Sequence, residues 1–186
     1  MLSVEEGWIL EEMIDPSGQV SASSPIDASE SLWLIQSSGP DQDLAVYKQE
    51  DLPNFAEETV KGVFRLSRRK EEGMVDKKSK VAKNNDSTSP DVGTKLLWED
   101  ANVKIWEFRL EPQETCNFHR HFLPYFFLNL SESLTQELNS EAKPVDRPPN
   151  LQTKGQCTYV SLENLGAHGV QNVGDDTFLQ FIVEFL

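Results

Sequence analysis

Cysteine, basic residues and long apolar runs are all scarce in this sequence of 186 residues. The two cysteines, Cys116 and Cys157, are too few for the disulfide framework of a small secreted domain. Lys and Arg total 17 against 31 Asp and Glu, which gives a net charge of -14, and such a chain repels nucleic acids and anionic membranes. The apolar runs are also too short to span a bilayer. We therefore expect neither a nucleic-acid partner nor a membrane partner.

The first residues, MLSVEEGW, lack the basic and long apolar regions of a secretory signal. Together with the low cysteine count, this predicts a cytoplasmic protein. A basic tract between Arg65 and Lys83 contains eight of the 17 Lys and Arg residues, and a nuclear-localisation role for it is the weaker alternative.

The chain divides into three parts by composition. Residues 1–64 form an acidic extension in which Lys48 is the only basic residue before Lys61, and LWLIQ and LAVYK predict short strands or arms there. Residues 65–92 combine basic residues with a run of Asn, Asp, Ser and Thr, which is typical of a flexible linker. Residues 93–186 form the domain proper.

The C-terminal part has the pattern of an all-β domain. KLLWE and VKIWEFRL predict two strands around a DAN turn, and TCNFHRH, LPYFFLNL, GQCTYVSL and DTFLQFIVEFL predict further strands. The last segment alternates, with Gln180 and Glu184 on one of its two faces. Many short strands with Pro and Gly turns and no helical crossovers predict an antiparallel sandwich or barrel.

The histidines suggest a site, because the sequence contains only three and two of them, His119 and His121, are two residues apart. On a strand, alternate side chains face the same side, so this pair would direct both imidazoles to one place. The third, His168, lies on another predicted strand. Three neutral imidazoles from separate strands can hold a divalent metal ion and leave coordination positions open.

Two stretches resemble the motifs of the cupin family. LEPQETCNFHRHFLPYFFLNL resembles the first motif, a Pro-Gly turn followed by His-x-His and a glutamate, and GQCTYVSLENLGAHGVQNVGDD resembles the second. All three histidines fall on the family's histidine positions, and Asn172 has the second motif's spacing from His168. Over residues 95–186, the resemblance implies a double-stranded β-helix, the jelly-roll barrel of cupins.

The sequence departs from these motifs at several positions. Gln113 replaces the glycine of the first motif, whose closing glycine is also absent, and the second motif is two residues longer than usual. The metal-binding glutamate is missing, since its positions hold Tyr125 and Phe126. A cupin site with three histidines and no carboxylate resembles those of thiol dioxygenases and diketone-cleaving enzymes.

The resemblance predicts that His119, His121 and His168 bind a divalent metal, with Fe(II) first and Zn, Ni, Mn or Cu as alternatives. Tyr125 is the candidate catalytic residue, as a hydrogen-bond donor or a base. Asn117, Gln180 and Asn172 are candidates for lining the pocket, Asn117 because it shares the sequence parity of the His pair.

Three functions follow as hypotheses, and the sequence alone does not decide whether the protein is an enzyme. The first is a metal-binding cupin that acts on a small molecule, of the mononuclear non-haem Fe(II) dioxygenase type. The second is a non-catalytic cupin module for dimerisation or ligand binding, and the third is a metal-dependent lyase or isomerase. A homodimer is also expected, because cupin barrels pair through edge strands or exchanged N-terminal arms.

Overall fold

The structure is a computed structural model that describes residues 2–3, 8–13, 31–38, 42–52, 60–68, 89 and 91–186. The chain divides into two compact units, an N-terminal unit of residues 1–76 and a C-terminal unit of residues 77–186. The described residues form strands, loops and two short 3-10 helices, η2 (Gln49–Asp51) and η4 (Leu162–Asn164). Among them, no helix has the length and apolar character needed to cross a membrane.

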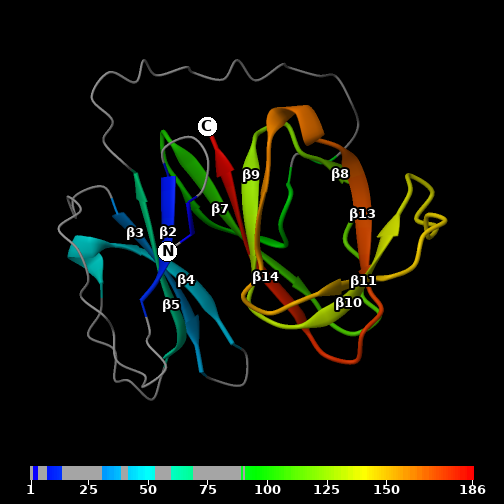
Figure 1. Cartoon of the computed structure of the whole chain (residues 1–186), viewed down its shortest axis with the longest axis horizontal. Coiled ribbons are helices and arrows are strands. Elements are labelled where there is room, and N and C mark those ends of the chain that lie inside the picture. The colour runs from blue at the N-terminus through cyan, green and yellow to red at the C-terminus, as the bar shows by residue number, and fades with distance from the viewer. Residues whose placement is uncertain are drawn as a thin grey trace. The chain divides into compact units, whose positions relative to one another are not determined.

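The N-terminal unit contains one antiparallel sheet with the order β1-β2-β5-β3-β4 (Figure 1). Its strands are β1 (Leu2–Ser3), β2 (Trp8–Glu12), β3 (Ser31–Ser37), β4 (Leu44–Lys48) and β5 (Val60–Arg68). The predicted strands LWLIQ and LAVYK correspond to most of β3 and to the whole of β4. Apolar residues of three segments, Met13, Trp33, Ile35 and Val63, pack together in this unit.

A buried ion pair joins two strands of this sheet. Glu11 on β2 lies directly opposite Arg65 on β5, and the two side chains form a salt bridge in which both are nearly inaccessible to solvent. Arg65 begins the predicted linker of residues 65–92, so β5 extends across the proposed boundary between residues 64 and 65. Residues 69–88 and 90 of that linker lie outside the described residues.

The C-terminal unit is built from two antiparallel sheets. The larger has the order β12-β9-β14-β7-β6 and the smaller the order β11-β10-β13-β8. The strands are β6 (Lys95–Glu99), β7 (Val103–Leu110), β8 (His119–Arg120), β9 (Tyr125–Asn129), β10 (Ser133–Leu138), β11 (Asn150–Gln152), β12 (Cys157–Val160), β13 (Ala167–Asn172) and β14 (Phe178–Phe185).

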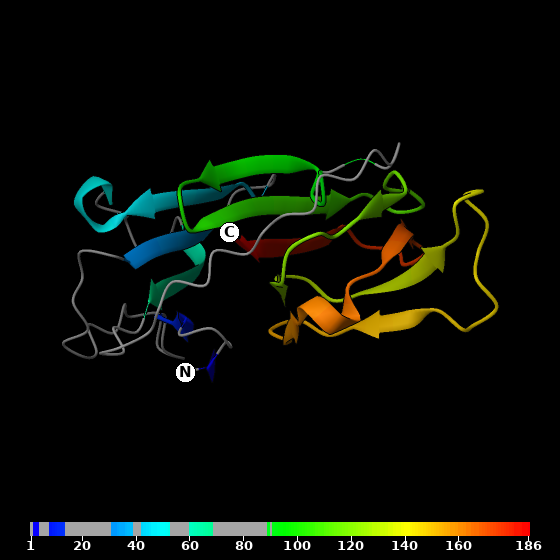
Figure 2. The same cartoon turned by 90° about the horizontal axis from the view of Figure 1, so that it is seen from above.

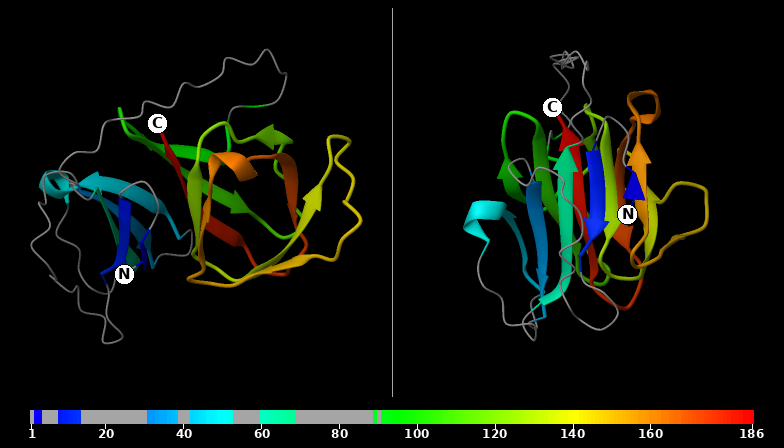
Figure 3. Two further views of the ribbon diagram at one scale, coloured as in Figure 1. Left: turned by 45° about the horizontal axis from the view of Figure 1, so that its top comes forward. Right: turned by 60° about the vertical axis from the view of Figure 1, so that its left-hand side comes forward.

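The path of the chain defines the fold. From β7 to β10 successive strands alternate between the larger and the smaller sheet, and after the hairpin of β10 and β11 the alternation resumes from β12 to β14. The two sheets of this unit form separate layers around a common interior (Figures 2 and 3). This arrangement is a double-stranded β-helix, and it confirms the predicted all-β fold class.

The interior of the barrel is apolar and largely aromatic. Inward-facing side chains of several strands form one cluster: Val92, Trp106, Phe108, Leu110, Tyr125, Phe178 and Ile182. Partly buried Cys116, Phe127, Val160, Leu165 and Val170 pack against it. Alternation along β7 and β14 places these residues inside, because every second side chain of a strand faces the same side of its sheet.

Candidate metal centre

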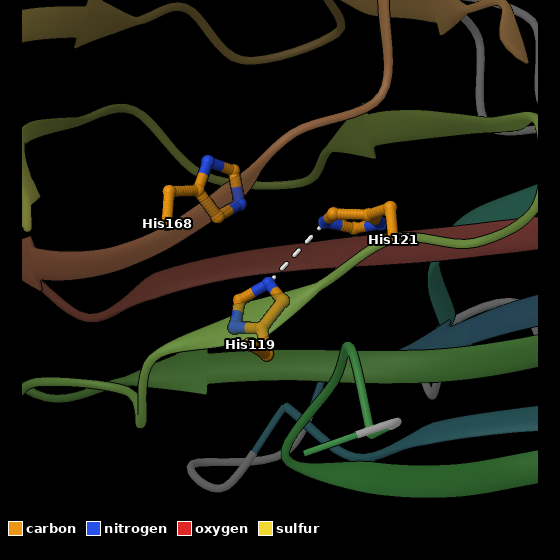
Figure 4. A group of neighbouring side chains, drawn as sticks. All are labelled: His119, His121 and His168. Atoms are coloured by element: carbon orange, nitrogen blue, oxygen red, sulfur yellow. Dashed lines mark hydrogen bonds between the residues drawn. The ribbon is translucent and has the colours of Figure 1, made fainter. Parts of the chain in front are cut away.

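The three histidines converge in the barrel. His119 on β8 lies directly opposite His168 on β13 in the ladder between these strands, and His121 follows β8 by one residue. The Nε2 atoms of His119 and His121 are 3.2 Å apart. One ring nitrogen from each histidine forms a group whose members all lie within 4.8 Å of one another, and the rings surround one space (Figure 4). The structure therefore brings together the three side chains that the sequence singled out.

A one-residue irregularity orients His119 toward the interior. Thr115 pairs with Gln171, and His119 pairs with His168. Between these two pairs the chain advances by four residues from Thr115 to His119 but by only three from Gln171 to His168, so the segment before His119 has one extra residue. Such an extra residue is the mark of a β-bulge, which reverses the face that later side chains occupy. Thr115 and His119 have the same sequence parity, yet only His119 faces the same side as His168.

His119 is fixed by a hydrogen bond behind its ring. Its Nδ1 lies 3.0 Å from the backbone oxygen of Asn117, which can only accept, so Nδ1 carries the proton. The lone pair of Nε2 is then directed at the other two histidines. A backbone carbonyl that accepts from Nδ1 and sets the tautomer in this way is typical of metal-binding histidines.

His121 is held differently. Its Nδ1 is buried and has no hydrogen-bond partner in the described part of the chain. The ring instead stacks on Tyr125, with ring centroids 4.0 Å apart and planes inclined by only 13°. His119 and His168 meet this imidazole edge to face, at interplanar angles of 68° and 89°.

All three imidazoles are neutral at neutral pH, which is the form that binds metal. Burial lowers the pKa of His119, and the bond to the Asn117 carbonyl only partly offsets this. Burial, followed by the neighbouring His119 and His168, lowers the pKa of His121 to about 2. Burial and His119 lower the pKa of His168 to about 4.

One pair of these nitrogens has the spacing expected of two ligands to one divalent cation. With metal-nitrogen distances of about 2.0–2.1 Å and tetrahedral angles, two ligating nitrogens lie about 3.3 Å apart. The His119 and His121 Nε2 atoms, 3.2 Å apart, already have this separation. The group contains no carboxylate, so a bound divalent ion would keep its full positive charge.

Tyr125, which stacks on His121, has Glu184 as its neighbour in the barrel wall. They lie opposite each other on β9 and β14, and both are buried. Burial and the charge of Glu184 raise the pKa of Tyr125 to about 12, so its phenol keeps its proton at neutral pH and can donate a hydrogen bond. Burial raises the pKa of Glu184 to about 7, although its Oε2 accepts a hydrogen bond of 2.9 Å from the Trp106 indole.

The three predicted pocket residues occupy different places. Asn117 lies within the irregular segment between Thr115 and His119; its side chain is exposed, and its backbone oxygen makes the contact with His119. The amide of Gln180 is buried and donates to Asn129 over 2.6 Å, four residues along β14 from Glu184.

Asn172 is completely buried and anchors the turn between β13 and β14. Its amide nitrogen donates to the backbone oxygens of Leu110 and Asp176 at 2.9 and 2.8 Å. Its side-chain oxygen accepts from the Ser133 hydroxyl and the Gly174 amide at 2.7 and 3.0 Å. All of its hydrogen-bonding groups are therefore occupied within the fold.

Two contributors to the site were not identified from the sequence. The backbone oxygen of Asn117 carries no side-chain signal, and the bulge hides its position. Glu184 was visible in principle, because strand alternation places it on the same face as the inward-facing Ile182, and a charged residue on that face is unusual.

Comparisons with known proteins give matches among solved structures, and these include cupins and RmlC-like proteins. A cupin domain from Bordetella pertussis is 21% identical, with 50% of this chain and 90% of that chain covered and a TM-score of 0.42. An RmlC-like cupin with a double-stranded β-helix fold from Methanocaldococcus jannaschii is 19% identical, with 55% and 84% covered and a TM-score of 0.39. A polyketide cyclase from Streptomyces resistomycificus is 12% identical, with 53% and 74% covered and a TM-score of 0.38.

No protein-family model and no curated protein matches this sequence. The three structural matches above cover about half of this chain.

Proposed function

We propose that the protein is a metal-dependent enzyme that acts on a small molecule, with His119, His121 and His168 as the metal ligands. The observation that supports it best is the distance of 3.2 Å between the Nε2 atoms of the buried His119 and His121. The Nε2 of His119 carries a lone pair, because the proton of that ring lies on Nδ1, which donates to the Asn117 carbonyl. Three neutral imidazoles facing one space are a donor set suited to Fe(II), Zn, Ni or Cu.

Fe(II) is the metal we propose, on the basis of the cupin resemblance. When bound, it would supply redox chemistry with dioxygen and a positive charge that favours an anionic or chelating substrate. The reaction class is dioxygenation, in which both atoms of dioxygen enter the substrate, so no further reductant is needed.

The chain's own residues have separate tasks in this proposal. His168 is the partly exposed member of the group, so the site is approached from its side. Tyr125, as a neutral phenol, is the candidate to donate a hydrogen bond to a bound substrate oxygen or sulfur. The aromatic interior excludes water from the space behind the histidines.

The test is oxygen uptake by anaerobically iron-loaded protein with a small thiol, cysteine, and a 1,3-diketone, acetylacetone. The proposal expects uptake of one dioxygen for each substrate molecule consumed, and its loss in His119→Ala. If zinc-loaded protein consumes the substrate and iron-loaded protein does not, the metal acts as a Lewis acid, and the lyase or isomerase hypothesis replaces dioxygenation. If loaded protein consumes no substrate under either condition, enzymatic action on these classes is refuted.

A second candidate, a metal-free binding or dimerisation module, is favoured by one specific contact. Because His119 Nε2 carries a lone pair, the Nε2 hydrogen of His121 can be donated to it across the same 3.2 Å. In that case His119→Ala would reduce stability without changing metal content, whereas the enzyme proposal expects the metal to be lost.

The cellular location we propose is the cytoplasm. Both cysteines, Cys116 and Cys157, are free thiols, which fits a reducing compartment. Fractionation with an antibody to the protein tests this, and recovery in the nucleus would instead favour a role for the basic tract.

A further inference from the structure

The two buried histidines differ in what orients them. His119 has the Asn117 carbonyl behind its ring, so both its tautomer and its direction are set by a hydrogen bond. His121 has no such partner on Nδ1. A ligand ring with no hydrogen bond behind it is free to rotate unless packing holds it, and rotation moves Nε2 away from its partners.

Packing on one face of the ring supplies this restraint. The nearly parallel Tyr125 ring, 4.0 Å away, is the only stacked ring contact among the described aromatic pairs of the site. Tyr125 is itself 7% exposed and belongs to the interior cluster, beside Trp106 and Ile182. Its position on β9 is fixed by pairing with both β14 and β12. The stacked face is therefore a rigid one.

We propose that Tyr125 is a positioning residue that holds the His121 ring in its metal-binding orientation by stacking, in place of the missing hydrogen bond. This role of Tyr125 rests on the proposed metal site, and it makes Tyr125 one of the residues that set the affinity of that site for metal. It also assigns the ring of Tyr125 a task that does not need the hydroxyl group. A phenyl ring at this position should perform that task equally well.

The experiment compares Tyr125→Phe, which keeps the ring, with Tyr125→Leu, which removes it. Phe127→Leu is the matched control: it lies two residues further on the same strand, packs against the same cluster, and its ring centroid is 6.5 Å from that of Tyr125. Dissociation constants for Zn2+ and Co2+ are measured by titration against a competing chelator, on protein whose strand content is checked by circular dichroism.

The wild-type protein and Tyr125→Phe are expected to bind with similar affinity, and Tyr125→Leu about tenfold more weakly. Phe127→Leu should lose stability but keep wild-type affinity. Equal affinity of Tyr125→Leu and wild type would overturn the positioning role. So would equal weakening by Phe and Leu, since that result assigns the contribution to the hydroxyl group.

A measurement on the metal-free protein keeps the inference testable if Tyr125→Leu does not fold. The His121 ring protons should resonate upfield of those of His168 in proton NMR, because they lie over an aromatic face, and Tyr125→Phe should preserve the shift. Absence of that shift would contradict the stacking. Failure of the wild-type protein to bind either metal while the shift is present would instead refute the proposed function.

Discussion

The buried carboxyl of Glu184 makes a quantitative prediction about stability. It is 4% exposed, and its Oε2 accepts a hydrogen bond from the Trp106 indole. Burial raises its pKa from 4.5 to about 7, Asp91 and Glu99 add to the shift, and the Trp106 bond and Lys104 oppose it. The folded protein thus binds this proton more tightly than the unfolded chain does. Stability is lost as pH rises from 4.5 through 7.

The perturbation is Glu184→Gln, which keeps an oxygen acceptor for the indole and removes the charge. A shift from 4.5 to about 7 corresponds to about 3 kcal/mol at 1.36 kcal/mol for each pH unit. The variant should therefore match the wild type at pH 4, below the unfolded pKa, and be about 3 kcal/mol more stable at pH 8. The assay is urea unfolding of chelator-treated protein at both pH values.

Exposed Glu163, changed to Gln, is the control and should alter the free energy of unfolding by less than about 0.5 kcal/mol at either pH. The effects of the histidines cancel, because the same three are present in both proteins. The carbon NMR signal of the Glu184 carboxyl should titrate near pH 7. The reasoning is refuted if Glu184→Gln is no more stable than wild type at pH 8, since the carboxylate would then be accommodated in its charged form.

Three further predictions concern the fold and the assembly. Gln113 has a positive φ of 66°, so Gln113→Gly should relieve about 1 kcal/mol of strain and raise the urea midpoint; a lower midpoint would contradict this. Asn172→Ala leaves buried partners such as Leu110 O and Gly174 N unsatisfied and should cost about 3 kcal/mol, measured in the same way; a loss below 1 kcal/mol would argue against the anchoring role. Light scattering should give twice the 21.1 kDa chain mass, and a monomer at all concentrations would refute the homodimer.

Strand alternation and turn residues were enough to predict an antiparallel sandwich or barrel, and the resemblance of two stretches to cupin motifs predicted the double-stranded β-helix. The alternating segment at the C-terminus became the central strand β14, and the DAN turn joins β6 to β7. Gln113 replaces the glycine of the first motif, yet it adopts the left-handed backbone conformation that glycine would favour. Its backbone N–H donates to the backbone oxygen of Asn172 over 2.8 Å.

The histidine group was predictable for a similar reason, because a His-x-His pair and a third histidine on another strand are a strong combination. The bulge before His119 was not, since an extra residue in a ladder leaves no mark in side-chain periodicity. For this reason the parity argument placed Asn117 beside the histidines, whereas its side chain is exposed. The stacking of Tyr125 on His121 also depends on tertiary packing that spacing cannot give.

The central claim is that His119, His121 and His168 bind one divalent metal ion. The direct test is elemental mass spectrometry of protein purified without a histidine tag, after anaerobic reconstitution, with His119→Ala and His168→Ala alongside. The proposed three-histidine site predicts about one equivalent of metal in the wild-type protein and loss of that metal in both folded variants. No metal in the wild type, or equal metal in the variants, would contradict it.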